Sequence, residues 1–508
     1  TIGIVGESGC GKSTLGRGIL QLYDQPAGTT MYYGKSRSEV APHYVWDTLN
    51  NVDRYIEKYR KAQHKANVAA EECSAAGEKA TFFQHQRKNL AEANAQTALT
   101  DVASIIGGFV AVPNNHEGIA LLKKRHANHV DITRTKSLIR DIENKISLIT
   151  EKLQKSENAK QKQSLQKRRD ALNQKIEILQ GELAKKNELR KTLREKLIAE
   201  KQRFADNEEF QKYEKLLDSG IDLSRLRYNE MRHLRRDLQI IFQDPYSSLN
   251  PRMTVGQIIE EGLVTHKMFT HGTDAMKQYI LKIMDECGLQ DYMLHRYPHQ
   301  FSGGQRQRIC IARALAVQPK FVVCDECVSA LDVSIQSQII NLLQDLKEKE
   351  HLTYLFISHD LSVVRFISDK IIVMYLGNIV EYASAEELFN DPRHPYTLAL
   401  LSSIPTTDPN SLDKERILLE GNIPSPIRPP DGCKFHTRCY MACEECKRVP
   451  PPLVEVKPGH FVACHRLEKK VENGKYLFEV TTEKRLNRVE QPEKDNSKNN
   501  SQSASSEK

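Results

Sequence analysis

The feature that most constrains this chain is a glycine-rich loop near its start, Gly6-Glu-Ser-Gly-Cys-Gly-Lys-Ser13. Residues 1–5 before it are apolar and predict a buried strand, and residues 13–22 after it have helical character. The spacing matches Gly-x-x-x-x-Gly-Lys-Ser/Thr, in which backbone N–H groups and a helix N-terminus surround phosphate oxygens. The loop therefore predicts a strand, a phosphate-binding turn and a helix within a parallel α/β sheet.

The residue types in this loop indicate its chemistry. We expect Lys12 to reach the β- and γ-phosphates of a nucleotide, and Ser13 to ligate Mg²⁺. The nucleotide-binding residues predicted in this segment are Gly6, Glu7, Ser8, Gly9, Cys10, Gly11, Lys12, Ser13 and Thr14.

The middle of the chain has a different texture. Residues 132–217 are rich in Lys, Glu, Gln and Leu, and their apolar residues follow heptad spacing, which predicts a coiled-coil seam. Residues 156–160 interrupt this pattern and form either a hairpin tip or a stutter. Residues 38–131 include the only Trp, Trp46, and show no pattern that predicts a fold. The heptad residues are Ile139, Ile142, Ile146, Ile149 and Leu153, followed by Leu165, Leu172, Ile176, Leu179, Leu183, Leu193 and Leu197.

Charge and hydropathy exclude some classes of protein. The longest apolar runs reach about eight residues, against roughly 18 for a membrane-spanning helix, so we expect no membrane span. Residues 151–200 carry 14 Lys and Arg against 8 Asp and Glu. We interpret this excess as the solvated face of a long helix, the alternative being a surface for nucleic acid or anionic lipid. Eleven widely spaced Cys without a secretory signal favour a reducing cytosol. The chain opens within an apolar strand, so we expect sequence upstream of Thr1.

A second apolar strand, residues 321–324, ends in Asp325 and Glu326. The first acid is predicted to associate with Mg²⁺ and the second to orient or deprotonate an attacking water. Acids often end strands, so the surrounding segments matter. These are Ile-Phe-Gln-Asp-Pro-Tyr-Ser-Ser-Leu-Asn-Pro at 241–251, Phe-Ser-Gly-Gly-Gln-Arg-Gln-Arg at 301–308, Ser-Ala-Leu-Asp at 329–332 and Ile-Ser-His-Asp at 357–360.

This ordered set resembles the ATP-binding subunits of ABC transporters, with a Q-loop, signature motif, Walker B strand, D-loop and switch histidine in that order. The Q-loop wording is similar to that of oligopeptide and dipeptide permeases. Residues 394–397, 419–426 and 432–439 resemble the F-type ATPase subunit of those permeases. The resemblance covers about residues 1–37 and 236–468. It implies an α/β P-loop NTPase fold, with a RecA-like core and a helical signature subdomain.

The resemblance also implies roles for single residues, with ATP and Mg²⁺ as ligands. Glu326 would be the general base, Gln243 would contact the Mg²⁺ and the attacking water, and His359 would hold the γ-phosphate. Mg²⁺ would be held through Ser13, Gln243 and Asp325. Residues expected to bind nucleotide across a subunit interface are Ser302 and Gly304, and Asp332 of the D-loop is a further predicted nucleotide-binding residue.

Five segments follow from these patterns. Residues 1–37 would hold the phosphate-loop part of the core, without its N-terminal strands, and 38–235 a helical and coiled-coil insertion. Residues 236–385 would hold the Q-loop, the signature subdomain and the Walker B half. Residues 386–468 would be a Cys-rich extension, and 469–508 a polar, disordered tail.

A cysteine cluster and one departure from the family pattern complete the site predictions. Relatives of the permease family with similar cysteine spacing carry a [4Fe–4S] cluster, and four thiolates also suit tetrahedral Zn²⁺. Free reduced thiols are the third interpretation, and Cys443 makes the fourth ligand ambiguous. Cys327 stands where the family usually has Pro, and we expect it to tune activity. The predicted ligands are Cys433, Cys439, Cys446 and Cys464.

The resemblance predicts the motor of an importer of oligopeptides or dipeptides at the cytoplasmic face of the membrane. Its expected partners are a D-type sister ATPase, two transmembrane permease subunits and, indirectly, a peptide-binding protein, with no nucleic acid. The alternative is a chromosome-maintenance or DNA-repair ATPase, but there the coiled coil follows the Q-loop, whereas here it precedes Gln243. A soluble translation factor would carry two heads, and this chain has one of each motif.

Overall fold

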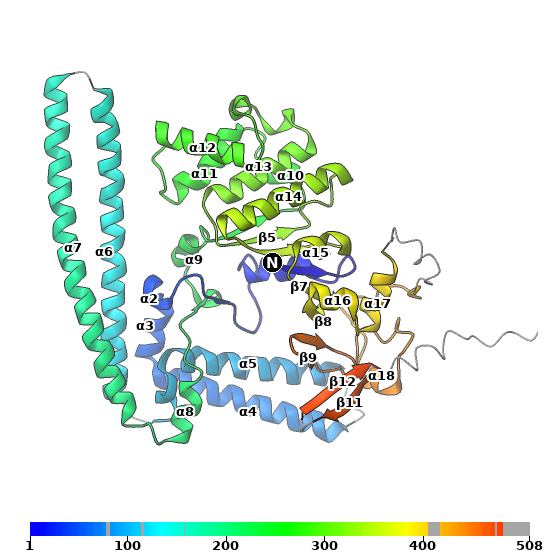
Figure 1. Ribbon diagram of the computed structural model, residues 1–508. Coiled ribbons are helices and arrows are strands. Elements are labelled where there is room, and N and C mark those ends of the chain that lie inside the picture. The colour runs from blue at the N-terminus through cyan, green and yellow to red at the C-terminus, as the bar shows by residue number, and fades with distance from the viewer. Residues whose placement is uncertain (78–81, 113–115, 157, 405–416, 473–474, 481–508) are drawn as a thin grey trace, which may run out of the picture. The chain divides into compact units, whose positions relative to one another are not determined.

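The computed structural model describes residues 1–77, 82–112, 116–156, 158–404, 417–472 and 475–480 (Figure 1). The chain divides into two units, Thr1–Gly377 and Asn378–Lys508. The predicted tail begins inside a hairpin that reaches residue 480, and residues 481–508 lie outside the described part of the chain.

Five parallel strands form the sheet of the first unit. Their order is β4 (Leu238–Ile241), β5 (Phe321–Asp325), β6 (Thr353–Ile357), β1 (Ile2–Val5) and β7 (Lys370–Tyr375). Successive strands in sequence are not all neighbours in space, as expected when helices connect parallel strands. The short apolar runs predicted as buried strands are β1, β5 and β6, so the predicted α/β fold is confirmed for this unit.

Helices cover both faces of this sheet. On one face, α1 (Lys12–Ile19) packs against a buried cluster that contains Ile4, Val323 and Leu355. On the other face, α15 (Leu361–Ile367) packs on β1, where a Cβ added at Gly3 would lie 2.3 Å from Val364 Cγ1. Alternate residues of each strand therefore point to opposite layers, and both layers are apolar.

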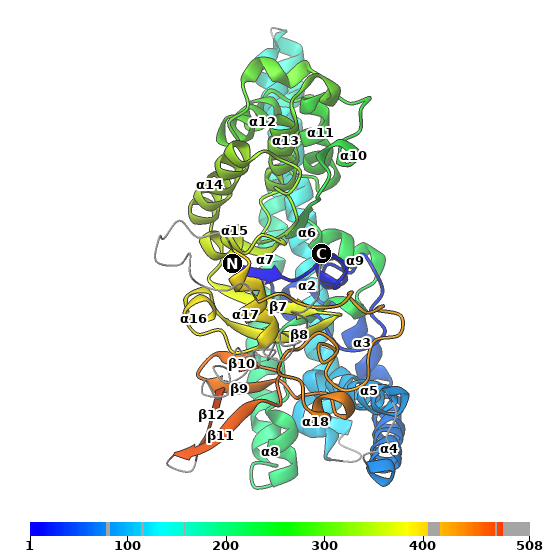
Figure 2. The ribbon, with the colours of Figure 1, turned by 90° about the vertical axis from the view of Figure 1, so that its right-hand side faces the viewer.

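The Q-loop and signature segments lie on a mostly helical part of the first unit. It consists of α10 (Pro245–Ser248), α11 (Val255–Thr265), α12 (Asp274–Glu286) and α13 (Gly303–Ala316), which Figure 2 shows together. Helix α14 (Val333–Glu350) follows, and its buried residues Ile339, Ile340, Leu343 and Leu346 lie on one face. The chain between α1 and β4 separates the phosphate loop from the Q-loop.

That intervening chain begins and ends in a two-stranded antiparallel ladder, β2 (Met31–Tyr32) with β3 (Ile221–Asp222). Between them, α4 (Val52–Ala76) packs along α5 (Phe82–Ile106), and α6 (His116–Lys155) packs along α7 (Ala159–Gln202). The predicted break at residues 156–160 is therefore the tip of a helical hairpin. Shorter helices complete this region: α2 (Arg37–Val40), α3 (His43–Asn50), α8 (Glu208–Glu214) and α9 (Tyr228–Leu234).

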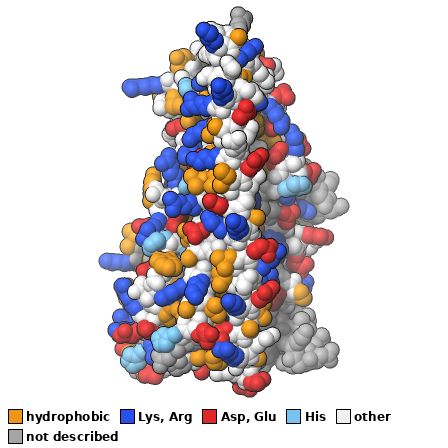
Figure 3. Space-filling model, turned by 90° about the vertical axis from the view of Figure 1, so that its left-hand side faces the viewer, with side chains coloured by type: hydrophobic (Ala, Val, Ile, Leu, Met, Phe, Trp, Pro, Cys, Tyr) orange, Lys and Arg blue, Asp and Glu red, His pale blue; other side chains and the backbone are white. Residues whose placement is uncertain are grey.

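The packing of these helices follows the apolar pattern. Ile139, Ile142 and Ile149 of α6 are buried, as are Leu193 and Leu197 of α7. Figure 3 views the side of the molecule on which this hairpin lies, and there Lys and Arg side chains are interspersed with acidic and apolar ones. This mixture is typical of a solvated helix face, because a nucleic-acid surface would gather one sign of charge.

The second unit contains a three-stranded antiparallel ladder. Its strands are β8 (Asn378–Ser384), β10 (His460–Val462) and β9 (Val454–Lys457), with β10 in the centre. Helices α16 (Ala385–Asn390), α17 (Pro395–Ser402) and α18 (Glu444–Arg448) complete it, together with a hairpin of β11 (Leu467–Glu472) and β12 (Lys475–Val480).

Candidate nucleotide-binding site

The glycine-rich loop joins β1 to α1, and all three of its glycines have positive φ. Gly6 has φ 151°, and a Cβ there would lie 2.3 Å from the Met374 carbonyl oxygen. Gly11, with φ 95°, is the N-cap of α1, and no side chain caps this helix. The first N–H groups of a helix lack intrahelical partners, so α1 presents uncapped donors at the loop, where an anion is favoured.

Lys12 is 4% exposed and lies folded into the loop. Its Nζ donates to the carbonyl oxygen of Gly6 at 2.8 Å and to that of Glu7 at 3.2 Å. The same ammonium lies 3.8 Å from Glu326 Oε1. A buried ammonium held by loop carbonyls places one positive charge where the phosphates of a nucleotide are expected.

Ser13 and Asp325 are 312 positions apart in sequence but adjacent in space. Ser13 Oγ donates to Asp325 Oδ1 at 2.5 Å, and the Asp325 residue is 1% exposed. A hydroxyl and a carboxylate are the hard oxygen ligands that Mg²⁺ prefers. The donor set at this point therefore fits the predicted magnesium site.

Arg17 is a member of the site that the sequence analysis missed. Its Nη2 lies 3.1 Å from Asp325 Oδ2 and forms an ion pair with it. Arg17 follows Ser13 by four positions on α1, so both side chains lie on one helix face. That spacing was the signal that could have identified it.

Glu326 is the centre of three polar contacts. Gln243 Nε2 donates to its Oε2 at 2.8 Å, His359 Nδ1 lies 3.8 Å from the same oxygen, and Lys12 approaches its other oxygen. Glu326 has φ 48°, a left-handed conformation that is uncommon for a residue with a Cβ. The structure thus brings the predicted general base, Q-loop glutamine and switch histidine together beside the phosphate loop.

The signature residues form a separate group. Ser302 caps α13, where its Oγ accepts from the Gln305 N–H, and Asp332 caps α14. A Cβ on Gly304 would lie 2.5 Å from Ile335 Cγ2, so the two helix starts are close. The contacts described for Ser302 and Asp332 join them to their own helices, and none joins them to the phosphate loop.

Cys327 lies directly after Glu326 and is 1% exposed. It hydrogen-bonds to Cys324 of β5, and this bond together with burial raises the pKa of the Cys324 thiol well above its ordinary value. The Cys324 thiol is therefore a protonated packing group beneath the site. The turn is also closed by Ser329, whose Oγ donates to the Glu326 carbonyl oxygen at 2.9 Å.

In the second unit, the predicted cysteine ligands lie in the loops around α18. Burial raises the pKa of Cys439 to about 11 and that of Cys464 to about 12, with smaller contributions from neighbouring thiols. The Sγ atoms of Cys443 and Cys446 are 3.3 Å apart. Among the described residues, however, no three His, Cys, Asp or Glu side chains converge as metal ligands. The donor chemistry fits a thiolate site, but the arrangement gives no support to the predicted cluster or zinc.

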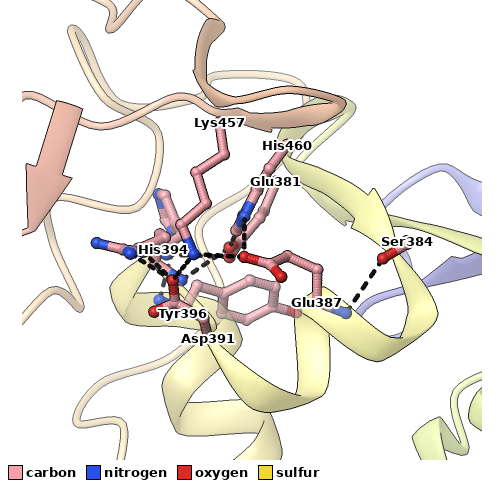
Figure 4. A network of polar contacts seen from close by, with 9 residues as sticks. Glu381, Ser384, Glu387, Asp391, His394, Tyr396, Lys457 and His460 are labelled. Carbon is pink, nitrogen blue, oxygen red and sulfur yellow. Dashed lines mark hydrogen bonds and ion pairs between the residues drawn. The ribbon is translucent and has the colours of Figure 1, made fainter. Parts of the chain in front are cut away.

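A buried polar network in the second unit holds the His394-Pro-Tyr segment in place (Figure 4). Glu381 is fully buried, and it accepts from the N–H of Arg393 and of His394, and from His460 Nε2 at 2.8 Å. Burial lowers the pKa of His394 to about 4, and its Nδ1 accepts from the Tyr396 N–H at 3.1 Å. The segment is thus fixed to β8 and β10 by hydrogen bonds to one carboxylate, a structural role that the sequence alone did not reveal.

Comparison with known proteins agrees with this geometry. The family described as "ABC transporter" matches residues 1–108 and 204–329, and that described as "Oligopeptide/dipeptide transporter, C-terminal region" matches 380–446. The first match leaves out residues 109–203, which contain the whole of α6 and α7.

Three curated relatives have similar names. A putative peptide import ATP-binding protein of Brucella ovis is 53% identical over 252 residues, covering 49% of this chain and 78% of the relative. The oligopeptide transport ATP-binding protein AppF of Bacillus subtilis is 52% identical over 252 residues, 49% of this chain and 76% of the relative. OppF of Haemophilus influenzae is 49% identical over 246 residues, 48% of this chain and 74% of the relative.

Among solved structures, CbiO1 of Clostridium perfringens, part of the ABC transporter complex CbiONQ, aligns with 34% of this chain and 69% of its own. The identity is 24% and the TM-score 0.31. The strand order and the motifs identify the fold of the first unit.

Proposed function

This chain belongs to the ATP-binding subunits of ABC transporters that import peptides, and from that premise we infer that it is the ATP-hydrolysing subunit of an oligopeptide importer. The observation that carries this conclusion is the convergence of Lys12, Ser13, Asp325 and Glu326 at the C-terminal ends of parallel strands. In open α/β sheets ligands bind at this end of the strands. The relatives named above give no support to the DNA-repair alternative.

The residues divide the work of phosphoryl transfer. We propose that Lys12 and the N–H groups at the start of α1 bind the β- and γ-phosphates. Ser13, Asp325 and Gln243 would hold Mg²⁺, which neutralises phosphate charge when bound. Glu326 would accept a proton from the attacking water, and its contact with Gln243 orients its carboxylate.

The second half of the site would come from a sister subunit. Ser302 and Gly304 lie at the start of α13, and the described contacts do not join them to this chain's own phosphate loop. We propose that they bind the γ-phosphate of ATP held by a D-type sister, because donors from a second subunit make hydrolysis depend on closure of the pair. His359 would hold the γ-phosphate within this chain.

The membership implies membrane permease partners, and we propose two of them, with a peptide-binding protein acting indirectly. No helix among the described residues is both long enough and apolar enough to cross a membrane. We propose that this chain docks at the cytoplasmic face of the membrane through the permease subunits.

We propose that residues 38–235 are a helical insertion into the ATPase head and that α6 and α7 pair as a coiled coil. Three observations support this: the antiparallel β2–β3 ladder at the base, the buried heptad residues, and the gap in the family match at residues 109–203. Each helix would extend the module at about 1.5 Å per residue.

We also keep a metal site at Cys433, Cys439, Cys446 and Cys464 as a proposal. It rests on the spacing of these cysteines in the sequence, because within the described residues they do not converge as ligands. Anaerobic purification should give a brown protein with iron and sulfide, or a colourless one with about one zinc. Metal-free protein whose five thiols all titrate freely would eliminate both.

Nucleotide binding tests the proposed function at the level of this chain. Lys12→Ala should weaken the binding of ATP and Mg²⁺ by about tenfold to a hundredfold, because it removes a charged donor. Lys349→Ala is the matched control, since its ammonium pairs with Glu286 away from the loop. Equal affinities of the Lys12→Ala and unaltered chains, measured by calorimetry, would contradict the proposal.

A further inference from the structure

A second cavity lies outside the nucleotide site, among the helices of the region between β2 and β3. Its volume is about 300 Å³. One wall is apolar and consists of Val45 and Leu49 of α3, Ile105 of α5, Leu122 of α6 and Leu217. The catalytic residues proposed above do not line it.

The opposite wall is cationic. Arg37 of α2 and Arg125 of α6 both line the cavity. Arg37 donates to the Ser104 carbonyl oxygen at 2.8 Å. Because a carbonyl oxygen carries no net charge, this bond does not neutralise the guanidinium. Within the described part of the chain, no hydrogen bond or ion pair engages Arg125. Burial, together with the charge of Arg194 nearby, lowers the pKa of Arg125.

Two histidines of α6 complete this wall. His126 and His129 are 6% and 8% exposed, and both line the cavity. The buried Nε2 of His126 has no hydrogen-bond partner in the structure, and its ring stacks on Trp46 with centroids 6.3 Å apart. Burial and the neighbouring arginines lower the pKa of each histidine to about 4, so both are neutral at pH 7. Burial is the larger cause, and the positive charge of the arginines adds to it.

The acidic side chain that lines the cavity, Asp218, is already engaged. It accepts from the Tyr33 hydroxyl at 2.7 Å and from the Gly220 N–H at 2.7 Å. One carboxylate therefore faces two guanidinium groups, and the outer arginines of α7, Arg190 and Arg194, add further positive charge. Asp218 attracts Arg37, whereas no carboxylate within the described part of the chain pairs with Arg125. Buried charges in proteins are normally paired, so Arg125 lacks a counter-anion.

We propose that this cavity binds a small organic anion, whose phosphate or carboxylate group lies between Arg37, Arg125 and the two histidines and whose apolar part contacts Leu49 and Leu122. Guanidinium groups bind both oxyanions through paired N–H donors. The neutral histidines can add N–H donors to the same group. The cavity is thus a ligand site built into the helical region, separate from the nucleotide site.

The test is a calorimetric titration of the full chain with phenyl phosphate, inorganic phosphate and benzoate. All titrations use the Lys12→Ala background, which is expected to weaken phosphate binding at the glycine-rich loop by about tenfold to a hundredfold. We expect phenyl phosphate or benzoate to bind more tightly than inorganic phosphate, since both carry an apolar ring. The tighter of the two identifies the oxyanion. Arg125→Gln should weaken this binding at least about tenfold, because it removes a charged donor, while Lys124→Gln, an exposed neighbour on α6, should leave it unchanged.

Two results would overturn the proposal: no binding of any probe at millimolar concentration, or equal binding by Arg125→Gln. If Arg125→Gln fails to fold, the ring resonances of His126 and His129 in the Lys12→Ala chain decide. Their shifts should move on saturation with phenyl phosphate or benzoate, and unmoved resonances would contradict the site.

Discussion

The ion pair between Arg17 and Asp325 gives a prediction whose size follows from burial. Asp325 is 1% exposed and Arg17 has a side chain that is 34% exposed. Removing one partner of a fully buried pair costs about 3–5 kcal/mol, and an exposed pair contributes about 0–1 kcal/mol. Asp325 keeps its hydrogen bond from Ser13. We therefore expect Arg17→Gln to lower the free energy of unfolding by about 2 kcal/mol.

The assay is urea unfolding followed by circular dichroism, without nucleotide. Lys191→Gln is the control, because the side chains of Lys191 and Glu188 are 67% and 72% exposed. Its free energy of unfolding should fall by less than about 0.5 kcal/mol. Repeating the measurement with Mg²⁺ and ATP should shrink the Arg17→Gln deficit, since a bound cation supplies positive charge to the same carboxylate. A deficit equal to that of the control would refute the argument that Arg17 compensates a buried charge.

Three further predictions follow. Ser302→Arg should impair hydrolysis at the sister subunit's phosphate loop more than at this chain's own, as measured by nucleotide trapped at each site, and equal impairment would contradict the shared site. Replacing residues 132–217 with a short linker should preserve ATP binding, and a folded deletion that no longer binds would show that the hairpin supports the site. Burial lowers the pKa of His394 to about 4, against about 6.5 when unfolded, so the unfolded chain gains protons first as pH falls and stability is lost below pH 6.5. Between pH 7 and 5, the free energy of unfolding of His394→Gln should fall by about 2 kcal/mol less than that of the unaltered chain. For His295→Gln, a substitution at an exposed position, the fall should equal that of the unaltered chain.

The nucleotide site was predictable because its residues lie in short motifs with fixed local geometry. A strand, a glycine loop and a helix place Lys12 and Ser13, and a second strand places Asp325 and Glu326. Arg17 was missed because it belongs to no motif, although its spacing of four positions from Ser13 placed it on the same face of α1.

Other parts of the chain show where sequence patterns are insufficient. The heptads of residues 132–217 predicted paired helices, but only the structure shows that the break at 156–160 is a hairpin tip. The network around Glu381 joins β8, β10 and the segment at His394, which are distant in sequence. Packing between α4 and α5 organises much of the described chain between residues 38 and 131. The apolar pattern of these two helices is too weak to predict that packing from the sequence.

The central claim is that Glu326 is the base for ATP hydrolysis at a site completed by a sister subunit. The most direct measurement is steady-state ATP turnover by the reconstituted transporter, with the sister's own site inactivated, comparing Glu326→Gln with the unaltered chain. We predict that turnover falls at least about a hundredfold while ATP remains bound, because the substitution removes the proton acceptor and keeps the binding groups. Turnover equal to that of the unaltered complex would contradict the account.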